Sequence, residues 1–244
     1  MVRCRAVRVL YRDELVIAID KPAGVATVPG RRAAGSRRSD AASEEPLSAQ
    51  VRAIAAEAMP VHRLDRDTSG VVLFALGKAA HRALSMAFES RRAEKTYLAL
   101  CRGDLPATRC DLPLAEARKG GMRIAAPTDP RAQPSLTEFT PLERFAGFTW
   151  VEARPRTGRT HQIRVHLAAL GHPLALDPRY GDAGPIEARE LLPGSDGVVL
   201  DRLPLHAASL RVPHPSGRGW LAVESPLPAD LARCLELLRA HRRA

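Results

Sequence analysis

Apolar residues along this 244-residue chain fall into many short runs with strand-like spacing and a few longer runs with helical spacing. Many strands with few intervening helices favour an α+β fold with a mixed, largely antiparallel sheet and flanking helices. The expected strands cover residues 7–10, 15–19, 71–76, 95–102, 136–145, 148–153, 205–212 and 220–223, and the expected helices cover 47–59, 78–91, about 160–170 and a segment from about 229.

Residues 61–70 crowd charged side chains directly before the apolar run 71–76, with a Thr-Ser-Gly turn signal between the two. Strand ends hold reactive groups steady, and the arginines on either side should keep the Asp65 carboxyl ionised at neutral pH. An ionised aspartate can serve as a nucleophile or a base. The alternative is that Asp65 or Asp67 only bonds nearby backbone amides in the turn.

A second motif, residues 156–166, leads from the strand 148–153 into the helix that ends before Gly171. Thr160 can cap this helix, and Gly171 fits the left-handed position past its end. The apolar stripe at helical spacing consists of Ile163, Leu167 and Leu170. Arg164 lies near this stripe and needs a buried anion as partner, for which Asp65 is a candidate.

The strand around residues 94–100 carries Tyr97, one of only three tyrosines in the chain. Tyrosine commonly buries its ring in a core or at a sheet edge and leaves its hydroxyl to a partner. The alternative is a platform on which a nucleic-acid base stacks. The strand itself does not distinguish the two.

Taken together, these segments resemble the RluA family of pseudouridine synthases. The matching motifs occur in the family's order and lie within residues 7–226: they are 21–24 leading to 28–30, 62–65 followed by 68–70, Lys95 with Tyr97, 158–166, and 205–207. One position departs from the pattern, because Leu176 stands before Asp177 where family members commonly have glycine.

The resemblance implies the pseudouridine synthase fold, with an active-site cleft across the middle of the sheet. It assigns the catalytic aspartate to Asp65, a base-stacking tyrosine that can act as general base to Tyr97, and the arginine paired with the aspartate to Arg164. Arg63 matches a position that fills the space left by a flipped nucleotide. The full RNA-binding set that we expect is Arg63, Arg66, Arg159, His161 and Gln162.

The implied reaction isomerises uridine within RNA, and it requires no cofactor and no metal. Asp65 has the chemistry to attack the sugar C1′ as a nucleophile or to remove a sugar proton so that uracil leaves by elimination. Both routes remain open. The implied partners are large-subunit ribosomal RNA, transfer RNA, or both, with access to the uridine by base flipping at a loop or bulge.

The formal net charge of +10 fits a polyanionic partner, although arginine enrichment can also reflect genome composition. The aromatic share of 4% argues against a broad stacking surface for single strands. There is no signal-peptide pattern and no apolar run long enough for a membrane span, so the expected location is the cytoplasm. The four scattered cysteines lack a zinc-ligand spacing and are expected to be reduced and structural.

We expect a single catalytic domain over residues 1–244 that acts as a monomer. Residues 30–45 contain paired arginines and small residues and are expected to form a mobile loop, which either grips phosphates or is a solvated insertion. The chain begins almost directly at the catalytic region. This favours the short RluA/TruC-like branch of the family, which lacks an N-terminal S4 RNA-binding domain.

The sequence opposes two other classes of function. An RNA-binding protein without catalysis would keep the basic surface and lose the chemistry, which the intact set of Asp65, Tyr97 and Arg164 opposes. A hydrolase or deaminase of small nucleotides is opposed because the chain has no G-x-S-x-G turn, no H-x-E with P-C-x-x-C set and no phosphate loop.

Overall fold

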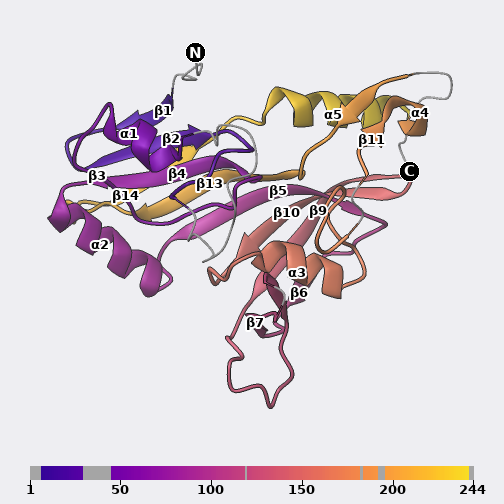
Figure 1. Ribbon diagram of the computed structural model, residues 1–244, viewed down its shortest axis with the longest axis horizontal. Coiled ribbons are helices and arrows are strands. Elements are labelled where there is room, and N and C mark those ends of the chain that lie inside the picture. Colours follow the sequence, from indigo (N-terminus) through magenta and orange to yellow (C-terminus); the bar gives the residue numbers. More distant parts are fainter. Residues whose placement is uncertain (1–6, 30–44, 119, 182–183, 192–195, 242–244) are drawn as a thin grey trace, which may run out of the picture. The chain divides into compact units, whose positions relative to one another are not determined.

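The computed structural model describes residues 7–29, 45–118, 120–181, 184–191 and 196–241. These residues form two compact units (Figure 1). Unit 1 comprises Met1–Ala93 and Ser209–Ser225, and unit 2 comprises Glu94–Ala208 and Pro226–Ala244. The expected loop 30–45 lies outside the described residues except for its last position. That it is mobile, and that the chain is a single catalytic domain, both stay predictions.

Unit 1 is built on antiparallel strands in the order β1-β2-β4, comprising Arg8–Arg12, Val16–Lys21 and Ser69–Leu76. The short strand β3 (Ala58–Pro60) pairs with the end of β4, and β14 (Trp220–Glu224) pairs with residues 209–213 of β13 (Leu205–Pro213). All eight residues of β4 are buried, and Val71, Leu73 and Ala75 on one face of the strand share a core with helix α2.

Two helices complete unit 1. Helix α2 (Lys78–Glu89) packs Leu84 and its neighbours against this core, as its helical spacing predicts (Figure 1). Helix α1 (Leu47–Arg52) is shorter than the expected helix 47–59. That prediction was wrong beyond Arg52, because residues 58–60 pair with β4 instead of continuing the helix, so a tertiary contact overrides local propensity.

Unit 2 holds antiparallel strands in the order β5-β10-β9-β6, comprising Glu94–Arg102, Phe148–Pro155, Thr137–Phe145 and Thr108–Cys110. The two faces of this sheet carry separate cores, and Figure 1 places helix α3 (Gln162–Ala169) and helix α5 (Ala229–His241) on opposite sides of the strands. Strand alternation therefore decides which helix each residue of β5 faces.

Several short elements of unit 2 were not predicted from the sequence. They are the hairpin of β7 (Leu114–Glu116) and β8 (Met122–Ile124), the pair of β11 (Ile186–Glu187) and β12 (Val198–Leu200), and helix α4 (Ala188–Leu191). Runs of two to four residues are too short to show a period. The α+β, largely antiparallel expectation is confirmed, and no helix of the described ranges is long and apolar enough to cross a membrane.

Candidate functional site

Asp65 lies in unit 1, in the loop between β3 and β4. The backbone N–H of Thr68 donates to the carbonyl of Asp65 at 3.2 Å, so the turn runs over residues 65–68, and Ser69 is already the first residue of β4. Asp65 is half-buried, whereas Arg63, Arg66 and Asp67 around it are exposed. A charged loop at the start of a fully buried strand is the placement that the sequence predicts.

The carbonyl of Arg66, directly after Asp65, is held by the segment around residue 21. Lys21 is fully buried, and its Nζ donates to the carbonyls of Arg66 at 2.8 Å, Val25 at 2.7 Å and Pro22 at 2.9 Å. The N–H of Gly24 donates to the same Arg66 carbonyl at 2.9 Å, and Arg66 Nε donates to the carbonyl of Gly24 at 2.7 Å. The motif 21–24 therefore clamps the backbone on one side of Asp65.

The residue before Asp65 is held as well. Thr27 Oγ1 donates to the carbonyl of Leu64 at 2.9 Å and accepts from its N–H at 3.1 Å, so one hydroxyl satisfies both backbone groups of a buried residue. His62 Nε2 accepts from the N–H of Leu73 in β4 at 3.0 Å, and the His62 ring stacks on Phe88 with centroids 4.8 Å apart. Asp65 thus lies between two backbone positions that hydrogen bonds fix.

Arg164 lies in unit 2 on helix α3 and is buried. Its Nε donates to Asp177 Oδ2 at 2.8 Å and its Nη2 donates to Asp177 Oδ1 at 2.7 Å, a bidentate pair with a carboxylate that is fully buried. The backbone N–H groups of Arg179 and Tyr180 also donate to Asp177 Oδ1, at 3.0 and 3.2 Å. Burial raises the pKa of Asp177, but the hydrogen bonds from Arg164 and this backbone outweigh burial and hold the pKa below its ordinary value.

The expectation that Arg164 pairs with a buried anion is confirmed. Within unit 2 that anion is the carboxylate of Asp177. The sequence did not single out this partner. Asp65 belongs to unit 1 and Arg164 to unit 2. The pairing of Asp65 with Arg164 therefore stays a prediction.

The residue before Asp177 is strained. Leu176 has a φ of +58°, in the left-handed region that favours glycine, and its side chain is buried. The resemblance to the family predicts glycine here, and Leu176 has the left-handed backbone that glycine favours. Asp177 then begins a turn in which the Gly181 N–H donates to its carbonyl at 3.0 Å.

Tyr180, in this turn, links Arg164 to the start of helix α3. The Arg164 Cζ lies 5.1 Å from the centroid of the Tyr180 ring. The Tyr180 hydroxyl lies 2.8 Å from His161 Nδ1 and accepts from the Met122 N–H at 2.8 Å. His161, with φ of +52°, is the N-cap residue of α3 and makes no side-chain cap bond, so the prediction of Thr160 as cap was wrong. Because His161 has a left-handed backbone, the helical residues of α3 start at Gln162.

Lys95 and Tyr97 point to the same face of β5, because they are two residues apart on a strand. Both are half-buried, and Tyr97 packs against the core on the α3 side of the sheet. Lys95 Nζ donates to the carbonyl of Thr157 at 3.1 Å, and burial lowers the pKa of Lys95 to about 8. Lys95 thereby connects β5 to the turn before α3.

Gln162 holds the same turn from inside. Its Oε1 accepts from the Thr157 hydroxyl at 2.6 Å and the Arg159 N–H at 3.0 Å, and its Nε2 donates to the Leu136 carbonyl and to Thr137 Oγ1, both at 2.9 Å. The side chain is almost fully buried.

Arg159 is half-buried, and its Nε donates to the Pro134 carbonyl at 3.4 Å. The contacts of Arg63, Arg66, Arg159, His161 and Gln162 with RNA stay predictions. In the described part of the chain, no three His, Cys, Asp or Glu side chains gather closely enough to hold a metal ion.

Comparison with known proteins gives a family match. A family model described as RNA pseudouridylate synthase matches residues 15–169. The chain is 36% identical over 231 residues to the ribosomal large subunit pseudouridine synthase C of Vibrio parahaemolyticus, covering 95% of the chain and 69% of that relative. It is 40% identical over 241 residues to the protein of the same name in Escherichia coli strain K12, covering 96% and 70%.

Solved structures agree with this match. The human RNA pseudouridylate synthase domain containing 4 aligns with a TM-score of 0.74 at 23% identity, over 95% of this chain and 93% of that one, and supports the fold. The human RNA pseudouridylate synthase domain containing 1 aligns with a TM-score of 0.68 at 29% identity, over 98% and 96%. The RluA/TruC-like branch stays a prediction, since the two relatives compared above are both named synthase C.

The matched residues 15–169 include Asp65, Tyr97 and Arg164, the three residues for which the motifs imply chemistry. The pseudouridine synthase fold and the similarity to curated synthases over nearly the whole chain agree with those motifs. The chain therefore belongs to the RNA pseudouridylate synthase family, as the resemblance to the RluA group implies, and is an enzyme that isomerises uridine to pseudouridine in RNA.

Proposed function

We propose that Asp65 is the catalytic carboxylate of this synthase and that the substrate is a uridine in large-subunit ribosomal RNA. The observation that carries the first half is the fixation of the backbone at Leu64 and Arg66, on both sides of a half-buried aspartate. A reacting carboxylate gains rate from being held in one geometry. The names of the relatives, which refer to the large ribosomal subunit, support the second half.

In the proposed reaction the target nucleotide leaves its stack, which costs a few kcal/mol and is easiest at a loop or bulge. The ionised Asp65 either attacks C1′ or removes a sugar proton, and in both cases the bond from C1′ to uracil N1 breaks. The uracil turns and C5 bonds to C1′, which releases the Asp65 oxygen from C1′ in the first route and returns the proton to the sugar in the second. The proton on C5 then leaves while N1 gains one. Substrate and product contain the same atoms, so the proposal includes no oxidant, reductant or group donor.

Arg164 and Tyr97 complete the proposed site. As the resemblance implies, we assign Arg164, whose guanidinium also pairs with Asp177, to orienting the Asp65 carboxylate. Tyr97 stacks on the uracil and lies near the C5 proton that leaves. Arg63 fills the space that the flipped nucleotide vacates, and Arg66, Arg159 and His161 contact the same RNA. The almost fully buried Gln162 acts indirectly, because it holds the turn at Thr157.

The test is tritium release from C5-labelled uridine in separate unmodified ribosomal and transfer RNA pools. We expect release from ribosomal RNA with the wild-type protein, and its loss in Asp65→Asn with RNA binding retained. The matched control is Asp67→Asn, which removes an exposed carboxylate two residues away and should leave the rate near wild type. Near-wild-type release by Asp65→Asn would overturn the assignment of Asp65, and release from transfer RNA alone would overturn the substrate.

The proposal also holds that the enzyme works without a metal, as a monomer and in the cytoplasm. Exhaustive dialysis against a chelator should leave the rate of tritium release unchanged, and sedimentation should give the mass of one chain. A rate that falls on dialysis and returns with an added divalent ion would contradict the metal-free reaction.

A further inference from the structure

Strand β14 carries a tryptophan on its outer face. Trp220 is 44% exposed, whereas Leu221 and Val223 on the same strand are buried in the core of unit 1. The other tryptophan of the chain, Trp150, is 4% exposed in unit 2. The strand register therefore places a large aromatic ring in solvent while its neighbours fill the core, and an exposed ring of this size is a candidate for contact with a partner.

Two arginines from separate segments lie within cation–π distance of this ring. The Arg211 Cζ lies 4.2 Å and the Arg92 Cζ 5.9 Å from the Trp220 ring centroid. Arg211 is on β13, where it pairs with Ala222 and is a diagonal neighbour of Trp220, whose partner is Pro213. We call Trp220, Arg211 and Arg92 the Trp220 patch. All three are exposed and belong to unit 1.

The end of helix α2 that carries Arg92 is built at a conformational cost. The N–H of Arg92 donates to the Ala87 carbonyl at 2.8 Å, and Arg91 between them has a φ of +59°. This is the helix-ending position that glycine or asparagine usually fills. Arg91 therefore places a positive charge at a position where the left-handed backbone favours glycine or asparagine. It directly precedes Arg92, which lies near the ring.

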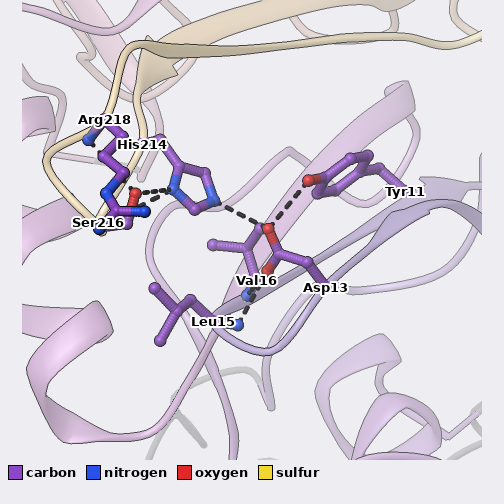
Figure 2. A network of polar contacts seen from close by, with 7 residues as sticks. All are labelled: Tyr11, Asp13, Leu15, Val16, His214, Ser216 and Arg218. Carbon is purple, nitrogen blue, oxygen red and sulfur yellow. Dashed lines mark hydrogen bonds and ion pairs between the residues drawn. The ribbon is translucent and has the colours of Figure 1, made fainter.

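The turn that precedes Trp220 carries a polar network (Figure 2). His214 Nε2 and Asp13 Oδ2 are 2.8 Å apart, and the Tyr11 hydroxyl donates to the same carboxylate oxygen at 2.9 Å. His214 Nδ1 lies 2.7 Å from Ser216 Oγ, which accepts from the Arg218 N–H at 3.3 Å. The network anchors the β13–β14 turn, which directly precedes Trp220, to the β1–β2 turn.

The charge around the ring is positive. The two segments of unit 1 that form the patch, residues 86–93 and 209–225, contain four arginines and two glutamates: Arg91, Arg92, Arg211 and Arg218 against Glu89 and Glu224. A stacked guanidinium presents its N–H groups in its own plane, the geometry that binds a phosphate bidentately. An indole face stacks on an unpaired base of any sequence. These two functions together match RNA, the polyanion on which this enzyme acts.

We propose that the Trp220 patch is a second RNA-contact site, at which Trp220 stacks on an unpaired base of the substrate RNA and Arg211 and Arg92 bind the adjoining phosphates. It recognises RNA outside the modified nucleotide. It contributes affinity for long RNA and takes no part in the isomerisation. The proposal depends on the RNA activity of the family and not on the assignment of Asp65.

The test measures the dissociation constant for a long ribosomal RNA fragment across a salt series, for wild type and for Trp220→Ala, Trp220→Phe, Arg92→Gln and Arg211→Gln. Loss of one stacked base should weaken binding roughly tenfold in Trp220→Ala, with partial rescue in Trp220→Phe. Each arginine variant should reduce the slope of log K against log salt by about 0.7–0.9 for each phosphate that it no longer binds. The matched control is Arg82→Gln, an exposed arginine on α2 outside the patch.

The rate of tritium release at saturating RNA should be unchanged in every patch variant, and a thermal melt checks that each one folds. RNA should also quench the exposed Trp220 fluorescence in wild type and lose this effect in Trp220→Phe. Affinity and salt slope equal to those of Arg82→Gln would overturn the patch as an RNA site, whatever the outcome for Asp65. A lowered rate at saturation with unchanged affinity would overturn it too.

Discussion

The loop that carries Asp65 and the helix that carries Arg164 hold their charged side chains in different ways. Around Asp65, the bonds described go to the backbone: Lys21 and Gly24 hold the Arg66 carbonyl, and Thr27 holds Leu64. Around Arg164 the bonds go to the side chain itself, through the bidentate pair with the buried Asp177.

The difference follows from the secondary structure. A helix satisfies its own backbone, so only the side chain at its surface remains to be fixed. A loop leaves its N–H and C=O groups to be satisfied from elsewhere, and the partners that satisfy them also fix the chain. The bonds described here therefore fix the loop through its backbone at Leu64 and Arg66, and fix the helix residue Arg164 through its side chain.

The largest effect is expected from breaking the charged pair. Asp177→Leu leaves the buried Arg164 without this carboxylate and should lower the free energy of unfolding by about 3–5 kcal/mol. The double variant Asp177→Leu with Arg164→Met replaces both charges by apolar groups and should recover most of that stability while remaining inactive. Urea denaturation measures both. A single variant that loses less than about 1 kcal/mol would show that the pair does not stabilise the fold as its burial implies.

The charged pair should also make stability depend on acid pH. The pKa of Asp177 in the folded protein lies below the ordinary value of 3.8, which we take for the unfolded chain. The pair therefore contributes fully above the unfolded pKa, and its contribution is lost as the pH falls through the folded pKa. Asp177→Asn should be less stable than wild type at pH 7, and the gap should narrow below about pH 4. A gap that stays constant from pH 7 to pH 3 would contradict this account.

A smaller effect is expected from Lys21→Met, which acts on the loop. The variant keeps the aliphatic stem but leaves the carbonyls of Pro22, Val25 and Arg66 without their ammonium donor, and should cost about 2–3 kcal/mol. Amide exchange at Gly24 should accelerate, and kcat should fall more than KM changes, because the Asp65 backbone loosens. Lys78→Met, an exposed lysine in the same unit, is the control and should change neither quantity.

The sequence correctly predicted the features that follow from hydrophobic periodicity and from local motifs. The buried strand after the charged loop, helix α2 with Leu84 inward, and the burial of Arg164 are all confirmed. The motif at 21–24 was recognised only as part of a resemblance, because its role depends on a contact with Arg66, 45 positions away. The roles of Asp65 and Tyr97 stay predictions that the geometry of each unit supports.

The sequence could not predict contacts between residues that only the three-dimensional fold brings together. Asp177 lies 13 residues after Arg164, beyond the helix, so no helical spacing connects the two. One signal could have found it: a leucine where the resemblance predicts glycine marks a left-handed backbone position, and the residue directly after it is Asp177. The helix expected to reach residue 59 failed for the same reason, since β4 recruits residues 58–60 into the sheet.

Thr27→Val should have a smaller effect than Lys21→Met, because it removes one hydroxyl while keeping nearly the same shape. Both backbone groups of Leu64 lose their partner, at a cost of about 1–2 kcal/mol, and kcat should fall severalfold with little change in KM. Thr27→Ser restores the hydroxyl and should restore kcat. If kcat does not follow the hydroxyl in this series, the backbone at Leu64 does not position Asp65.

The smallest effect concerns the strain beside Asp177. Replacing Leu176 by glycine removes a buried side chain but relieves a left-handed leucine, whereas the same change at Leu174, also buried but outside the left-handed region, only removes a side chain. Leu176→Gly should therefore cost about 1–2 kcal/mol less than Leu174→Gly in urea denaturation. Equal costs would mean that the turn is not strained. A smaller cost at Leu176 together with wild-type kcat would show that the backbone turn, and not the leucine, holds Asp177 in place for Arg164.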